Sequence, residues 1–173
     1  TLFRSGLHNV TFLQGDILDM NFPAGSFDHV FLCFVLEHLS SPLEALDHLL
    51  RVLKPGGSMT VIEGDHGSTF FHPHSVAAHE VIQCQVELQR RAGGNANIGR
   101  ELYPLLTAAG LQDIHVSPRM VYVDASRLAL VEGFTCNTFT AMIEGIRQPA
   151  LETGLIDAAS FDQGIHDLYR TTE

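Results

Sequence analysis

The sequence is poor in lysine: Lys54 is the only one among 173 residues, and the arginines are scattered along the chain. Lysine and arginine together number 10 against 20 aspartates and glutamates, which gives a formal net charge of -10. A nucleic-acid-binding protein usually presents a basic face. We therefore expect no nucleic-acid partner for this chain.

Cysteine and long apolar runs are also scarce. Cys33, Cys84 and Cys136 are an odd number of widely spaced residues with no CxxC pair, which argues against a disulfide framework or a structural zinc site. A reducing cytoplasm is the simplest location. The sequence contains no run of about 18 apolar residues, so no membrane span is predicted. No signal peptide is visible either.

The first third of the chain reads as strand, helix and strand. Residues 28–34 and 58–63 are apolar runs that predict strands buried on both faces. Between them, Ser41-Pro42 predicts the start of a helix, and Lys54-Pro55-Gly56-Gly57 predicts its end. Together these features indicate a parallel β-α-β unit. A shorter strand is predicted over residues 9–14, ahead of Gly15-Asp16.

The rest of the chain reads mainly as helix. We expect a polar loop over residues 64–75. Residues 112–116 and 120–123 are expected to form a hairpin, or the whole segment 112–123 one longer strand. Four helical stretches are also expected. The expected helical stretches are 76–91, closed by Gly93-Gly94; 98–109, capped by Gly110; 127–147, ending in a break at Pro149; and 157–169.

Five short motifs, in this order and spacing, resemble the class I S-adenosylmethionine (SAM)-dependent methyltransferases of the quinone-biosynthesis type. The resemblance begins at the third strand of that domain. The motifs are Phe12-Leu13-Gln14-Gly15-Asp16-Ile17, Ser26-Phe27-Asp28-His29-Val30, Leu36-Glu37-His38, Leu53-Lys54-Pro55-Gly56-Gly57 and Ala109-Gly110-Leu111.

The family's glycine loop, E/D-x-G-x-G-x-G, and the acidic residue that binds ribose have no counterpart in this sequence. The chain could therefore be a fragment, a degenerate relative, or a segment that completes its sheet with another chain; we favour a fragment. The resemblance implies an α/β, Rossmann-like parallel sheet that lacks strands 1 and 2 and carries extra C-terminal helices. We expect a partial methyltransferase domain at 1–125 and a helical extension at 126–173 packed on it.

The resemblance implies that the cofactor is SAM and that it binds where strands end, as in other open α/β sheets. Asp16 would accept from the adenine amino group, and the backbone N–H of Ile17 would donate to a ring nitrogen. The backbone at Cys33 and Phe34 would hold the methionine ammonium. His38 would line the pocket. The alternatives are a turn-capping role for Asp16, core packing for Cys33 and a structural hydrogen bond for His38.

Asp65 and His66 follow the strand predicted at 58–63, where the methyl acceptor approaches in this family, and are our candidate catalytic residues. Either side chain could take a proton from the acceptor. His66, His72, His74 and His79 do not match a standard metal-site spacing, so we expect no metal.

The resemblance implies methyl transfer from SAM to a small-molecule acceptor. Quinone-type, sterol-like and metalloid acceptors stay open. The alternative function is a methyltransferase-like module that does not bind SAM alone and acts by association. Without the glycine loop, we expect the isolated chain to be inactive and its SAM affinity to be weak or undetectable. We also expect it to self-associate through an exposed apolar sheet edge.

Overall fold

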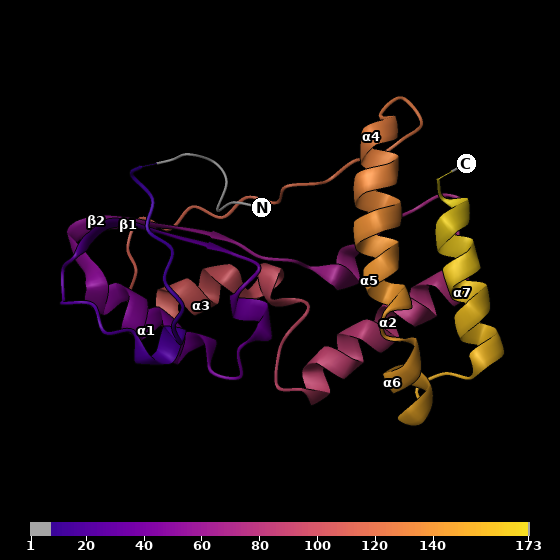
Figure 1. Cartoon of the computed structure of the whole chain (residues 1–173), viewed down its shortest axis with the longest axis horizontal. Coiled ribbons are helices and arrows are strands. Elements are labelled where there is room, and N and C mark those ends of the chain that lie inside the picture. The colour runs from indigo at the N-terminus through magenta and orange to yellow at the C-terminus, as the bar shows by residue number, and fades with distance from the viewer. Residues whose placement is uncertain (1–7, 173) are drawn as a thin grey trace.

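A computed structural model describes residues 8–172, so the outermost ends of the two expected domains, residues 1–7 and 173, lie outside the described part. Two parallel strands, β1 (Phe27–Cys33) and β2 (Leu53–Ile62), are joined by helix α1 (Pro42–Val52) (Figure 1). This unit confirms the β-α-β prediction. The strand pair and α1 follow from two apolar runs and a helix that begins with proline in its first turn.

The second strand begins earlier than the sequence predicts. Phe27 pairs with Leu53, but His29 pairs with Ser58, so the residues between Leu53 and Ser58 bulge out of the ladder. Gly56 has a φ of 77° there, a value that glycine adopts without steric cost. The Lys54–Gly57 segment is therefore a bulge inside β2 and not a turn ahead of it.

The strands are buried on one face only. Leu32 is 6 % exposed and lies in the core with Val30, whereas Phe31 is 59 % and Ile62 44 % exposed. Successive side chains of a strand point to opposite faces, and helices cover only the face that carries Val30 and Leu32. The prediction of burial on both faces is wrong for the described residues, and so is the expected core packing of Cys33, which is exposed.

Apart from α6, which covers the predicted break at Pro149, the remaining helices agree closely with the predicted stretches. They are α2 (Val76–Arg91), α3 (Leu102–Ala108) after a 3-10 turn (Ile98–Glu101), α4 (Leu128–Leu130), which continues through a π-helical segment (Val131–Thr140) into α5 (Ala141–Glu144), α6 (Arg147–Glu152) and α7 (Ala158–Arg170).

Two boundaries of these helices have clear causes. The Ser75 hydroxyl accepts from the backbone N–H of Ala78 and caps α2. The predicted break at Pro149 falls instead at Gly145 and Ile146. Pro149 lies in the first turn of α6, where a missing N–H costs no hydrogen bond.

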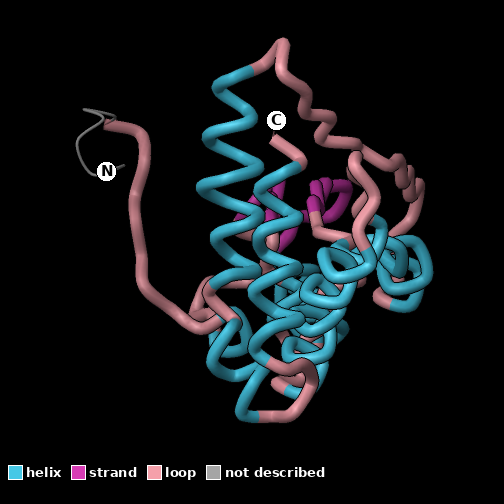
Figure 2. The backbone as a smooth tube through the Cα atoms, turned by 90° about the vertical axis from the view of Figure 1, so that its right-hand side faces the viewer, coloured by secondary structure: helices cyan, strands magenta, loops and turns pink. Residues whose placement is uncertain are grey.

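Two apolar clusters organise these elements. The first joins the covered sheet face to α1, the 98–101 turn and α3; the second joins α2 to α5, α6 and α7. In Figure 1 the sheet, α1 and α3 lie at one end of the molecule and α5, α6 and α7 at the other, and α2 runs obliquely past the lower end of the α4–α5 column. Figure 2 shows α7 running alongside the α4–α5 column.

Three predicted strands are not strands. Residues 9–14, 112–116 and 120–123 are loop, and residues 9–14 run apart from the sheet in Figure 2. A strand requires a hydrogen-bonded neighbour, but among the described residues β1 and β2 pair only with each other. These segments have strand-like apolar patterns, but no described strand pairs with them. Separately, no helix between residues 8 and 172 combines the length and apolar character needed to cross a membrane.

Candidate functional site

The carboxyl ends of the two strands are tied together by Glu63, the residue that follows β2. Its Oε1 accepts from the backbone N–H groups of Val35 (3.1 Å) and Leu36 (2.9 Å), and its Oε2 accepts from that of Glu37 (3.3 Å). One carboxylate thus satisfies three donors at the start of the 3-10 turn Leu36–His38. Such charge-assisted bonds are stronger than neutral ones, so the chain after β1 is held in a fixed place.

Phe34 directly follows β1 and turns the chain sharply. Its φ is 54°, in the left-handed region that a non-glycine residue rarely adopts. The backbone N–H of Phe34 donates to the Ile62 carbonyl at 2.8 Å, but no hydrogen bond within the described residues reaches the Phe34 carbonyl oxygen. The side chain is 53 % exposed. A free carbonyl therefore lies at the end of β1, as the resemblance requires for an ammonium group.

Asp65 lies two residues beyond Glu63 and is held by an arginine. Both oxygens of Asp65 accept from Arg100 Nε at 3.0 Å, and Oδ2 also accepts from the Ser68 hydroxyl at 2.7 Å. Burial raises the pKa of the Asp65 carboxyl, but the hydrogen bonds from Arg100 and Ser68 outweigh it, so the pKa lies below the ordinary value. An anion stabilised in this way is a weak base, which favours an anchoring role.

His66 lies against a buried acid. Its Nε2 is 3.3 Å from Glu37 Oε2, and the two side chains are only 16 % and 6 % exposed. The backbone N–H of His66 donates to the Ala96 carbonyl at 3.0 Å. The structure therefore brings His66, Asp65 and the turn after β1 together at one edge of the sheet.

A glycine-rich segment, residues 93–99, closes this edge from the side. A Cβ on Gly94 would lie 2.5 Å from the Glu37 carbonyl oxygen, and a Cβ on Gly99 would lie 2.7 Å from that of Gly64. Only glycine permits such close backbone approach. Sequence reasoning used Gly93-Gly94 to end a helix but did not connect the segment with the site. Its closely spaced glycines were the available signal.

Asp16 and Ile17 occupy a 3-10 turn, Ile17–Asp19, that packs against α1. Oδ1 of Asp16 accepts from the Leu18 N–H at 2.9 Å, which is the capping role weighed as the alternative. Among the described residues, neither Asp16 Oδ2 nor the N–H of Ile17 forms a hydrogen bond. No hydrogen bond or ion pair joins this turn to the strand ends. However, Ile17 packs against the apolar cluster that contains Leu36.

Cys33 and His38 flank the same edge. Cys33 is the last residue of β1, opposite Ile62, and is exposed. The His38 side chain is 63 % exposed, with Nε2 at 3.4 Å from Glu37 Oε1 and Nδ1 at 3.5 Å from Gln89 Nε2. His38 therefore borders the site at its solvent side.

The Phe34 carbonyl has the chemistry needed to bind the ammonium group at the methionine end of SAM. An ammonium group needs acceptors, and the Phe34 carbonyl is an acceptor without a partner among the described residues. The free Asp16 Oδ2 and Ile17 N–H offer the acceptor and donor that an adenine edge needs.

The histidines of the 64–79 region do not form a metal centre. His79 lies 4.5 Å from the Phe71 ring and 5.5 Å from that of His74, measured between ring centroids. Across residues 8–172, no three histidine, cysteine, aspartate or glutamate side chains converge as metal ligands.

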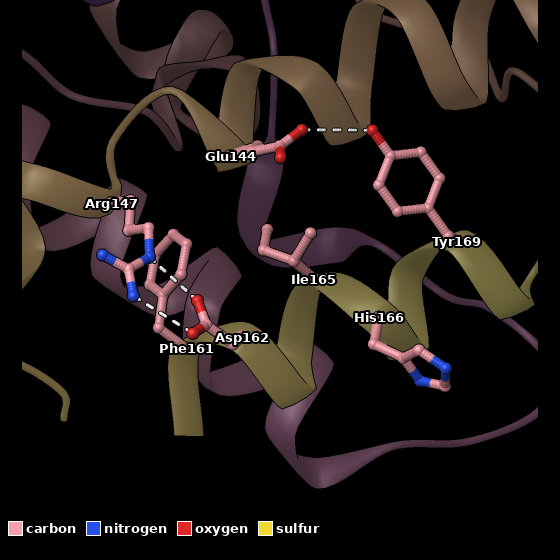
Figure 3. Close-up of a pocket in the computed structure, with 7 residues that line it drawn as sticks. All are labelled: Glu144, Arg147, Phe161, Asp162, Ile165, His166 and Tyr169. Carbon is pink, nitrogen blue, oxygen red and sulfur yellow. Dashed lines mark hydrogen bonds and ion pairs between the residues drawn. The ribbon is translucent and has the colours of Figure 1, made fainter. Parts of the chain in front are cut away.

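A separate cavity of about 300 Å³ lies among the C-terminal helices, away from the strand ends (Figure 3). Arg147 donates to Asp162 from Nε at 2.8 Å and Nη2 at 3.1 Å, and the Tyr169 hydroxyl donates to Glu144 at 3.1 Å. Burial and the Glu144 carboxylate raise the pKa of Tyr169. Because these charged groups already satisfy one another, the cavity offers little to a polar ligand.

Comparison with known proteins points to one family. The family model described as "Methyltransferase domain" matches residues 2–61. An uncharacterized methyltransferase of Schizosaccharomyces pombe is 35 % identical over 102 residues, which is 59 % of this chain and 36 % of that protein.

Two bacterial relatives carry a more specific name, demethylmenaquinone methyltransferase. That of Listeria welshimeri is 39 % identical over 60 residues, 35 % of this chain and 25 % of its own length. That of Geobacillus stearothermophilus is 28 % identical over 139 residues, 71 % of this chain and 58 % of its own length. The chain thus spans less than two thirds of the length of each of these relatives.

Proposed function

We propose that this chain, which carries part of a class I SAM-dependent methyltransferase domain, transfers a methyl group from SAM to a small-molecule acceptor at the carboxyl ends of β1 and β2. The observation that supports this site most directly is the Glu63 carboxylate, which binds three backbone N–H groups after β1. It fixes the turn beside the free Phe34 carbonyl.

SAM supplies a methyl group that is bonded to a positively charged sulfur. When the methyl group is transferred, the sulfur becomes a neutral thioether. The residues of this chain then have to bind and orient the cofactor and the acceptor, and they have to exclude water from the site. The Cys33–Phe34 backbone would hold the ammonium and Asp16 with Ile17 the adenine. His38 would border the pocket. Asp65 and His66 would face the acceptor, with Asp65 anchored by Arg100.

The acceptor we favour for a first test is a quinone-type ring, because two relatives are named for demethylmenaquinone. Sterol-like and metalloid acceptors are tested beside it. We place the reaction in a reducing cytoplasm, where Cys33, Cys84 and Cys136 would stay unpaired.

The test is an assay of the full-length protein with methyl-labelled SAM and a soluble demethylated naphthoquinol. We expect the label on the ring, detected by mass spectrometry, and loss of most transfer in Glu63→Ala. Transfer to none of the three acceptor classes would contradict the proposal, and a lack of SAM binding as well would favour the module that does not bind SAM alone.

A further inference from the structure

Glu37 is a buried acid that has no role in the methyl transfer proposed above. The residue is only 5 % exposed, and a buried carboxylate is costly unless a partner compensates it. Oε2 makes no hydrogen bond of good geometry among the described residues. Nε2 of His66 lies 3.3 Å from this oxygen.

Resting on the proposed function, we infer that Glu37 is a positioning residue for His66. Its carboxylate holds the imidazole with a proton on Nε2, which leaves Nδ1 with a lone pair for the methyl acceptor. A carboxylate that orients a histidine and stabilises its charged form is a general device of proton transfer. Among the described residues, Nδ1 of His66 has no hydrogen-bond partner.

Both partners are anchored by their backbones. The Glu37 N–H donates to Glu63, while its carbonyl accepts from the N–H of Asn95 at 2.8 Å and from Gln89 Nε2 at 2.9 Å. The backbone of His66 is tied to Ala96. The pair is therefore held by groups other than its own contact, which is what a preorganised site requires.

Gly64 makes room for the pair. A Cβ at this position would lie 3.0 Å from His66 Nε2 and 3.2 Å from Glu37 Oε2. Both distances are tighter than ordinary Cβ contacts. Alanine at position 64 would push between the two side chains.

Other charged groups around the pair are engaged elsewhere. Asp65 is held by Arg100, and Glu63 by the backbone after β1. His38 contacts the opposite oxygen of Glu37, at 3.4 Å, from the solvent side. His66 is therefore the group at this edge with a free nitrogen and an orienting acid.

In the step we infer, the acceptor atom forms a bond to the methyl carbon while the carbon–sulfur bond breaks and its electron pair goes to sulfur. The proton of the acceptor passes to Nδ1 of His66. The imidazolium that results faces the Glu37 carboxylate. Charge and atoms balance without a further reactant.

One test does not need activity. In ring-¹⁵N-labelled protein we expect a slowly exchanging N–H signal at Nε2 of His66. It should persist in Glu37→Gln, whose amide oxygen still accepts, and disappear in Glu37→Leu and in Gly64→Ala. Glu44→Leu, on the exposed face of α1, is the matched control and should keep the signal. Absence of the signal in the unmodified protein, or its survival in Glu37→Leu, would overturn the inference.

The second test separates positioning from a merely structural role. We expect His66→Asn to lower kcat about 100-fold and Glu37→Leu to lower it about 10- to 100-fold, with the KM for SAM unchanged and with rescue in Glu37→Gln. In the His66→Asn background, Glu37→Leu should cost nothing further. An equal loss in both backgrounds would overturn the inference. A normal N–H signal in a protein that transfers no methyl group would instead contradict the proposed function on which the step rests.

Discussion

Glu63 accepts a 2.9 Å hydrogen bond from the backbone N–H of Leu36, 27 residues away in the sequence. This bond joins the residue after β2 to the turn after β1. In an open α/β sheet, ligands bind at the carboxyl ends of the strands. The side chain that holds those ends together is therefore the structural centre of the candidate site.

Removing the Glu63 carboxylate should destabilise the protein. Glu63→Ala leaves three part-buried donors without an acceptor, and we expect a loss of about 2–3 kcal/mol in the free energy of unfolding. Glu63→Gln keeps one acceptor oxygen and should lose about 1 kcal/mol. Urea unfolding measures both values. Glu44→Ala is the control and should change stability by about 0.5 kcal/mol or less; an equally small loss in Glu63→Ala would contradict the bridging role.

Gly164 is required where α7 crosses α2. A Cβ there would lie 2.5 Å from the Ala77 carbonyl oxygen and 2.6 Å from Val81 Cγ1. Gly164→Ala should therefore destabilise the protein by about 1–3 kcal/mol, although alanine is the better helix former.

Gly133 provides the comparison for that substitution, because beyond its own stretch of helix backbone a Cβ there would meet nothing within 4 Å. Gly133→Ala should be neutral or stabilise by up to about 1 kcal/mol. Thermal unfolding of the two variants in parallel distinguishes close packing from helix propensity. Equal melting temperatures would refute the close approach of α7 and α2.

The clamp between Asp65 and Arg100 should make part of the stability depend on pH. The folded-state pKa of Asp65 is lowered from 3.8, so its ionised form stabilises the fold at any pH above that value. This contribution is lost as the pH falls through the lower, folded-state pKa. Asp65→Asn should thus be less stable than the parent near neutrality and approach it in strong acid. A difference that does not change with pH would mean that the carboxylate charge is not what stabilises the clamp.

Asp16 should contribute to SAM affinity in the full-length protein. Loss of its free carboxylate oxygen in Asp16→Ala should cost about 1–3 kcal/mol of binding, or roughly 5- to 150-fold in Kd. Calorimetric titration measures it. Asp19→Ala, in the same exposed turn, should leave the Kd unchanged. An unchanged Kd in Asp16→Ala would remove this residue from the site.

The elements that depend on local signals could be predicted from the sequence. Helix α2 lies where Ser75 and the glycines after Arg91 indicate, and the β-α-β unit follows from apolar runs and a Ser-Pro helix start. The predictions that were wrong concern features that depend on a neighbouring strand or a covering element. Residues 9–14 have strand-like composition but no neighbouring strand, and Phe31 is exposed because nothing in the described chain covers its face.

The residues proposed for the site came from local signals and from the family resemblance. Position after a strand selected Asp65 and His66, and the resemblance selected Phe34. The long-range contacts of Glu63 and Glu37 were not visible, because hydrogen bonds between residues 26 to 52 positions apart leave no periodic pattern. Asp16 was expected at the end of a strand, but residues 9–14 are loop, and its observed contact is the capping hydrogen bond weighed as the alternative.

The central claim is that the carboxyl ends of β1 and β2 bind SAM. The most direct measurement is titration of the ¹⁵N-labelled full-length protein with SAM up to high concentration, followed by amide NMR spectra. The account predicts concentration-dependent shifts, even at weak affinity, in Asp16–Leu18, Cys33–His38 and Glu63–His66. Shifts confined to the cavity between Glu144 and Tyr169, or none at all, would contradict it.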